Sequence, residues 1–106
     1  MFLSPWAGGL VRVSVLDCRD ATADHPCALV LVRPAADASR LAPSDVRLLG
    51  ALVDGWGHDR IRTVRGVSDP AGRARRLAHD LALPSPEALV QHAAREGLFL
   101  PPLLWR

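Results

Sequence analysis

The chain changes its hydrophobic period close to residue 39, and this change limits what it can fold into. Residues 10–17 (LVRVSVLD) alternate valine with arginine and serine, which is typical of a half-buried strand. Residues 27–34 (CALVLVRP) form a second β-type run, and the polar connection between the two predicts an antiparallel hairpin. Beyond residue 40, apolar residues recur at steps of three and four. With room for one domain in 106 residues, we expect an α+β fold in which a β-hairpin precedes helices.

Four helices are expected after the hairpin. In the first, Pro43 occupies the position of a first helical residue, and Gly55 that of a left-handed C-cap. Asp69 and Ser85 are the expected N-caps of the third and fourth helices, and each is followed by proline. The predicted helices span residues 43–54, 58–64, 69–81 and 86–96.

The pattern divides the chain into a hairpin (1–39), a helical unit (40–98) and an apolar tail (99–106). A lone two-stranded hairpin is marginal in water. It must therefore pack on the rest of the chain, pair with a second copy, or belong to a larger sheet. Pro101 and Pro102 prevent a helix in the tail, which we expect to lie on the domain surface or on a partner.

No segment approaches the length of a membrane span. The longest apolar runs fall well short of about 18 residues, and the N-terminus MFLSPWAGG lacks the basic region of a signal peptide. We therefore expect no membrane partner and a cytoplasmic location.

Arginine is concentrated in one segment. The chain has 13 basic residues, all of them arginine, and a formal net charge of +2. Six of these arginines fall within residues 60–76, where the single acidic residue is Asp69. Such a segment can attract an anionic partner, although a solvated arginine face is the alternative.

Residues 41–61, LAPSDVRLLGALVDGWGHDRI, with Val67-Ser68 after them, resemble the LuxR-type (GerE-like) helix-turn-helix. The resemblance extends over residues 41–98. It implies a DNA-binding transcriptional regulator whose third helix enters the major groove. The hairpin is similar to the closing strands of a GAF or PAS sensory domain, and a stand-alone hairpin is the alternative. The matching positions are Leu41, Pro43, Asp45, Leu49, Leu52, Asp54, Gly55, Ile61 and Ser68.

The sequence departs from the family pattern in the first and third predicted helices. Ala42 replaces the capping threonine and Asp45 the capping-box glutamate, so the first helix is expected to be less well capped, by about 1 kcal/mol. Ala71 and Gly72 replace a Thr-Val pair in the third helix, which is shortened. Such a helix would read other bases, bind DNA without specificity, or not bind it.

The resemblance and the charge together select the residues expected to contact duplex DNA. Helix 69–81 would present its basic side chains to the groove, and the arginines before it would hold phosphates, with Arg47 as a further contributor. A degenerate helix-turn-helix that binds or dimerises with proteins without contacting DNA is the alternative function. The expected DNA-binding residues are Arg60, Arg62, Arg65, Ser68, Arg73, Arg75, Arg76 and His79.

The fourth helix is expected to pair two copies of the chain, together with the hairpin or the tail. Leu89, Val90 and Ala93 form an apolar stripe on it, and the tail adds more apolar residues than a short chain readily leaves in water. We therefore expect a homodimer. The alternative is a monomer whose tail folds back over the hairpin.

Nothing in the sequence points to an enzyme. None of the hydrolase, metalloprotease or nucleotide-binding motifs is present, and the four histidines are scattered. Cys18 and Cys27 are expected to be free thiols, and with His25 they fall short of a regular zinc-ligand pattern. We expect no cofactor and no metal.

Overall fold

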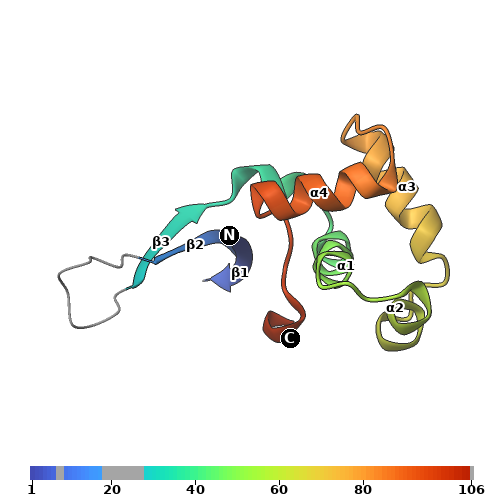
Figure 1. Cartoon of the computed structure of the whole chain (residues 1–106), viewed down its shortest axis with the longest axis horizontal. Helices are drawn as coiled ribbons and strands as arrows, with labels where there is room; N and C mark the ends of the chain where they lie inside the picture. Colours follow the sequence, from blue (N-terminus) through green and yellow to red (C-terminus); the bar gives the residue numbers. More distant parts are fainter. Residues whose placement is uncertain (7–8, 18–27, 106) are drawn as a thin grey trace.

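Three antiparallel strands precede four helices, which confirms the expected α+β fold (Figure 1). The computed structural model describes residues 1–6, 9–17 and 28–105, so Cys18, His25 and Cys27 lie outside the described residues. The sheet lies at one end of an elongated molecule and the helices at the other. The elements are β1 (Phe2–Trp6), β2 (Gly9–Asp17), β3 (Ala28–Pro34), the 3-10 turn η1 (Ala36–Arg40), α1 (Pro43–Val53), α2 (His58–Arg65), α3 (Pro70–Asp80), α4 (Pro86–Glu96) and the 3-10 turn η2 (Pro102–Leu104).

β2 is the central strand of the sheet, with β1 on one side and β3 on the other. The antiparallel β2–β3 pair is the predicted hairpin. β1 is an additional strand that the sequence pattern does not predict, because FLSPW shows no alternation and contains Pro5. Proline is tolerated here because β1 is an edge strand, where a missing backbone donor need not break the ladder.

The helices begin and end within one residue of the predicted positions. The Asp69 carboxylate accepts a hydrogen bond from the Gly72 backbone at 3.1 Å, and Ser85 Oγ accepts one from Ala88 at 3.1 Å, so both expected N-caps are confirmed. Ala42 makes no side-chain capping bond to α1, as its side chain requires.

Gly55 ends α1 as predicted. Its φ is +85°, in the left-handed region. The backbone N–H groups of Gly55 and Trp56 donate to the carbonyls of Leu52 and Ala51 at 3.1 and 3.0 Å, which is the Schellman pattern. The stretch VDGWG is therefore a tight joint that turns the chain from α1 into α2.

The tail packs on the rest of the domain, as expected, and contributes the buried side chain of Leu100 to the core. Leu98 and Leu100 are buried in a cluster with Leu3 of β1 and Val46 of α1. The Leu3 N–H donates to the Phe99 carbonyl at 2.8 Å, and the Leu100 N–H donates to the Val46 carbonyl at 3.0 Å. The tail thus lies between the sheet and α1 and binds the backbone of both (Figure 1).

Gly50 makes the passage of the tail across α1 possible. A Cβ atom at this position would overlap the carbonyl group of Leu100. A side chain on α1 at residue 50 would therefore push the tail away and break the Leu100–Val46 hydrogen bond.

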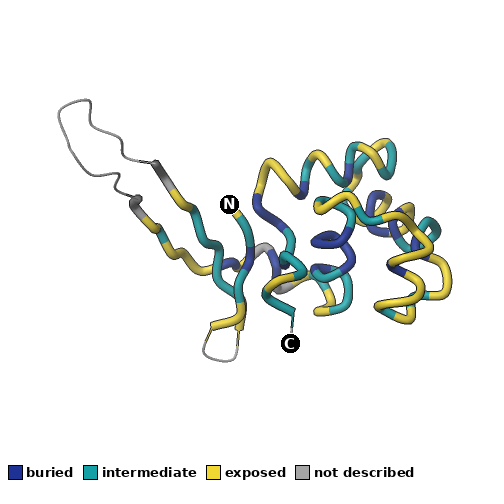
Figure 2. The backbone as a smooth tube through the Cα atoms, turned by 60° about the horizontal axis from the view of Figure 1, so that its bottom comes forward, coloured by how far each residue is buried: buried dark blue, intermediate teal, exposed yellow. Residues whose placement is uncertain are grey.

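α4 is packed into the helical core, which changes the expectation for its apolar stripe. Leu89 and Ala93 are fully buried against α1, α2 and α3, and Val90 is half-buried (Figure 2). Three helices alone leave an open side, and α4 closes it. Leu89 and Ala93 are therefore not available to a second copy in this fold.

Within the described ranges, every helix is too short or too polar to cross a lipid bilayer.

Candidate nucleic-acid interface

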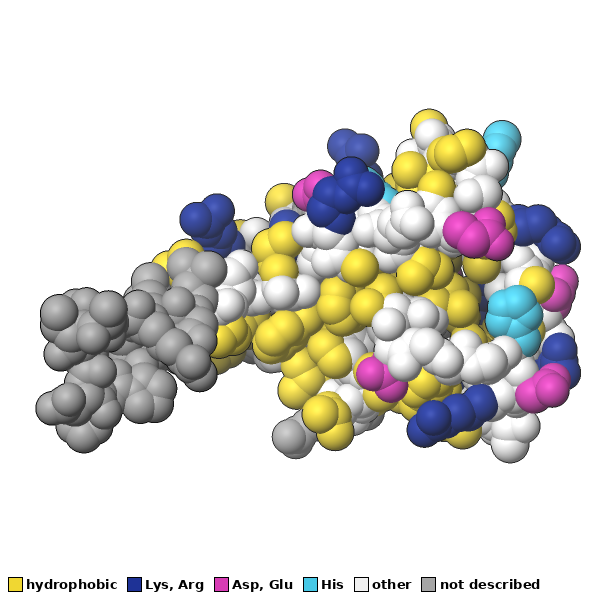
Figure 3. Space-filling view, in the orientation of Figure 1, with side chains coloured by type: hydrophobic (Ala, Val, Ile, Leu, Met, Phe, Trp, Pro, Cys, Tyr) yellow, Lys and Arg dark blue, Asp and Glu magenta, His cyan; other side chains and the backbone are white. Residues whose placement is uncertain are grey.

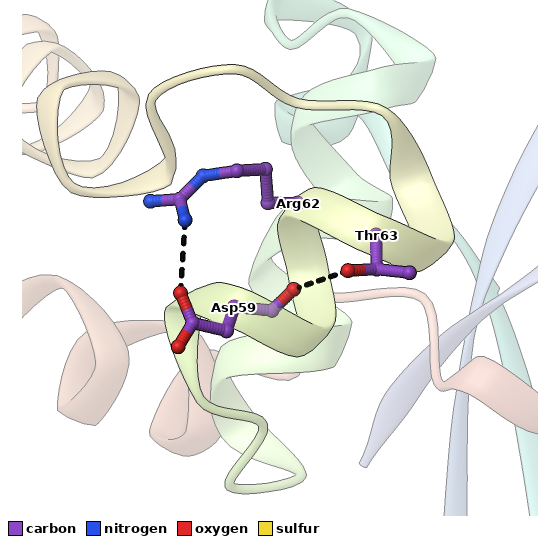
Figure 4. A network of polar contacts seen from close by, with 3 residues as sticks. All are labelled: Asp59, Arg62 and Thr63. Carbon is purple, nitrogen blue, oxygen red and sulfur yellow. Dashed lines mark hydrogen bonds and ion pairs between the residues drawn. The ribbon is translucent and has the colours of Figure 1, made fainter.

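α2 holds its three arginines outside the core. Ile61 is the buried anchor of the helix, whereas Arg60 and Arg62 are exposed and Arg65 is half-buried. Arg62 Nη1 lies 2.8 Å from Asp59 Oδ1 (Figure 4). The Asp59 side chain is 97% exposed, and such surface pairs contribute about 0–1 kcal/mol. Arg62 can therefore exchange this carboxylate for a phosphate at little cost.

Two tryptophans support the other two arginines of α2. The guanidinium carbon of Arg60 lies 3.9 Å from the ring centroid of Trp56, and that of Arg65 lies 4.8 Å from the ring of Trp105. The two rings meet edge to face, with centroids 5.1 Å apart. Stacking uses the face of a guanidinium and leaves its N–H donors, which lie in the plane, free to bind an anion.

A short left-handed turn joins α2 to α3. Gly66, with φ of +67°, ends α2, and its N–H donates to the Arg62 carbonyl at 3.0 Å. Ser68 follows in an exposed position, and Asp69 then caps α3. A Cβ atom at Gly72 would overlap the Asp69 carboxylate, so a side chain at residue 72 would require this carboxylate to shift.

Arg73 does not lie on the outer face of α3, where the sequence placed it. Its Nε lies 3.2 Å from Asp45 Oδ1, and its Nη2 donates to Ser44 Oγ at 2.9 Å. The first turn of α1 is close enough for the side chain to bind it, so Arg73 joins α3 to α1. Asp45 therefore serves as a partner for α3 instead of completing a capping box.

Arg75, Arg76 and His79 are exposed on α3, as predicted. Ala74, Leu77 and Ala78 bury the opposite side of the helix. Across the residues that the structure describes, no side-chain hydrogen bond or ion pair engages these three basic residues. Their basic groups are thus available to an external anion.

The groove between α1, the α2–α3 turn and α3 is of mixed charge. It measures about 730 Å³, and Arg65, Arg73 and Arg76 line it. Three aspartates, at positions 45, 69 and 80, line the same groove. Acidic and basic side chains also alternate over the helical end of the molecule (Figure 3). An anion is therefore better placed on the outer face of α3 than inside this groove.

Arg47 lies in α1 and is half-buried. The structure does not group it with Arg75, Arg76 and His79. In the described parts of the chain, no three His, Cys, Asp or Glu side chains come together in a way that could hold a metal ion.

Comparison of the chain with models of known families, with curated proteins and with solved structures gave no match.

Proposed function

We propose that the protein is a cytoplasmic, LuxR-like transcriptional regulator that binds duplex DNA through α3. Arg75, Arg76 and His79 would face the major groove. Arg60, Arg62 and Arg65 of α2 would hold phosphates, with Ser68 at the turn between the helices. Bound arginine can contact guanine edges or phosphate in bidentate fashion.

The observation that carries the proposal is the exposed basic face of α3, which follows a tight left-handed turn from α2. An α-helix with its side chains is about 10–12 Å across and the major groove is about 12 Å wide, so the 11-residue α3 can lie in the groove. The tryptophans add support, because they restrain the side chains of Arg60 and Arg65 and so lower the entropy lost when these bind an anion.

A protein-interaction module without DNA binding is the second candidate. The involvement of Arg73 with Asp45 favours it, as do the three aspartates of the groove, because both reduce the positive potential near α3. The two functions differ in their salt dependence. Binding to duplex DNA weakens with salt, with a slope of log K against log salt of about −0.9 for each phosphate contacted.

Fluorescence anisotropy with a labelled random duplex, titrated at several salt concentrations, tests the proposal. We expect Arg75→Ala with Arg76→Ala to weaken binding strongly and to make the slope less negative. Arg95→Ala is the matched control, because it removes an exposed arginine from α4. A wild-type protein that does not bind even at low salt would leave the protein-interaction module as the function.

A further inference from the structure

The outer face of α3 carries a small set of basic side chains that lie close together. A helix turns by about 100° for each residue, so Arg75, Arg76 and His79 fall within about 100° of one another around the axis. All three are exposed, whereas Ala74 and Ala78 bury the other side of the helix. α3 also lies at the end of the molecule far from the sheet (Figure 1). Arg75, Arg76 and His79, here named the basic stripe, are therefore the side chains that α3 offers to a partner.

The basic stripe presents mainly hydrogen-bond donors. An arginine has five N–H donors and no acceptor, and an imidazole always has at least one N–H donor. The sequence of α3, PAGRARRLAHD, contains no asparagine or glutamine to bind adenine in bidentate fashion. Its three alanines, which could contact a thymine methyl group, are buried or half-buried. The helix thus matches base edges that present acceptors.

Guanine is the base that presents two acceptors, N7 and O6, side by side in the major groove. Adenine has one acceptor beside a donor amino group, and thymine has one acceptor beside a methyl group. The planar fork of an arginine can donate to both guanine acceptors at once. Asp80, the last residue of α3, is exposed as well, and a carboxylate can accept from the N4 amino group of cytosine. Both kinds of side chain therefore favour a G·C pair.

The basic stripe is long enough to reach two neighbouring base pairs. Arg75 and His79 are about 6 Å apart along the helix axis, whereas stacked base pairs are about 3.4 Å apart. Arg73 does not extend the stripe, because its guanidinium binds Asp45 and Ser44 of α1. Recognition thus depends on the two arginines and the histidine of the stripe.

We infer that the basic stripe gives the protein a preference for duplex DNA with neighbouring guanines over duplex DNA of A·T pairs. This preference rests on the proposed function and adds the class of base that α3 recognises. A bidentate contact between arginine and guanine discriminates against another base by about tenfold or more. We therefore expect a duplex with neighbouring guanines to bind at least about tenfold more tightly than one of A·T pairs.

Fluorescence anisotropy at one fixed salt concentration, with two labelled duplexes of equal length and equal ends, tests the preference. The centre of one duplex contains GG steps, and the centre of the other is a mixed sequence of A and T. Replacement of guanine by 7-deazaguanine removes the N7 acceptor but keeps base pairing and phosphate charge. It should lower the affinity of the GG duplex towards that of the A·T duplex. Replacement by inosine removes only the amino group in the minor groove, so the preference should remain.

Arg75→Lys with Arg76→Lys separates base recognition from charge. Lysine keeps the positive charge but lacks the planar fork, so this variant should lose more affinity for the GG duplex than for the A·T duplex. Arg62→Lys is the matched control. Arg62 of α2 is exposed and is proposed to hold a phosphate, so its replacement should change the affinity for both duplexes by the same factor.

The outcomes distinguish this preference from the proposed function. Equal affinity for the two duplexes overturns the guanine preference but leaves DNA binding in place. So does a preference that survives 7-deazaguanine, or one that is unchanged in the double lysine variant. Absence of binding to both duplexes, even at low salt, overturns the proposed function and the preference with it.

Discussion

Arg73 of α3 binds Asp45 of α1, with Nε 3.2 Å from Oδ1, and this contact joins two residues 28 positions apart in the sequence. The Asp45 side chain is only 17% exposed, so this pair is better shielded from water than the Arg62–Asp59 pair. Arg73 is thus a structural residue on a helix whose other basic residues are exposed.

Arg73→Ala should therefore lower stability, whereas Arg76→Ala should lower the affinity for duplex DNA. Arg73→Ala removes the bonds to Asp45 and Ser44, and we expect it to lower the free energy of unfolding by about 1 kcal/mol, with little change in duplex affinity. Arg76→Ala should weaken DNA binding and leave stability within about 0.5 kcal/mol. Urea denaturation and anisotropy measure the two properties. Loss of DNA binding by a stable Arg73→Ala protein would show that Arg73 leaves Asp45 to bind DNA.

Gly50→Ala should be one of the most damaging single-methyl substitutions in the chain. The new Cβ meets the Leu100 carbonyl, so the tail must move off α1, at a cost of about 1–3 kcal/mol or more. Differential scanning calorimetry measures the loss. Leu103→Ala, at a tail residue that is 96% exposed, should cost less than about 0.5 kcal/mol. Equal melting temperatures for the two variants would contradict the close passage of the tail.

Gly55→Val should destabilise the joint between α1 and α2. A β-branched residue in the left-handed region costs about 1–2 kcal/mol. Gly55→Asn is the control, because asparagine tolerates this region far better than other residues. Chemical denaturation should rank the wild type first, Gly55→Asn second and Gly55→Val last. An unchanged Gly55→Val protein would mean that residue 55 does not end α1 in this conformation.

Ala82→Gly should stabilise the protein. Ala82 follows α3 with φ of +58°, and it is the one residue other than glycine with positive φ among those described. Relief of this left-handed strain outweighs the entropy that glycine adds to the unfolded chain, for a net gain of about 0.5 kcal/mol. The shift of the thermal midpoint measures it. A lower midpoint would place the backbone of residue 82 outside the left-handed region.

Trp105→Ala should act on DNA binding through Arg65. Loss of the ring frees the Arg65 guanidinium, so we expect weaker duplex binding and a smaller effect of Arg65→Ala in the Trp105→Ala protein than in the wild type. A double-mutant cycle in anisotropy measures this coupling. Additive effects of the two substitutions would show that Trp105 does not position Arg65.

Local signals in the sequence predicted the helices and the β2–β3 hairpin. Caps such as Asp69 and Ser85 act within a few residues, so their position along the chain is enough to find them. β1 escaped prediction because its place depends on pairing with β2 and on the contact between Leu3 and Phe99, neither of which leaves a periodic pattern.

The candidate interface was predictable only in part for the same reason. Helical periodicity placed Arg75, Arg76 and His79 on the outside of α3 correctly. Periodicity also placed Arg73 there, because the pattern of one helix carries no information about Asp45 on its neighbour. Likewise, the apolar stripe of α4 indicates burial, but it does not tell whether the chain itself or a second copy covers Leu89 and Ala93.

The bond between Leu3 and Phe99 joins residues separated by almost the whole chain, and this affects how the protein folds. Bringing together the ends of so long a loop costs about 4 kcal/mol of chain entropy. Contacts within a helix or a hairpin close much shorter loops and cost less. Folding slows as contacts become less local. We therefore expect the sheet to dock on the helices late in folding, and during translation this docking must wait until the ribosome has released residues 98–100.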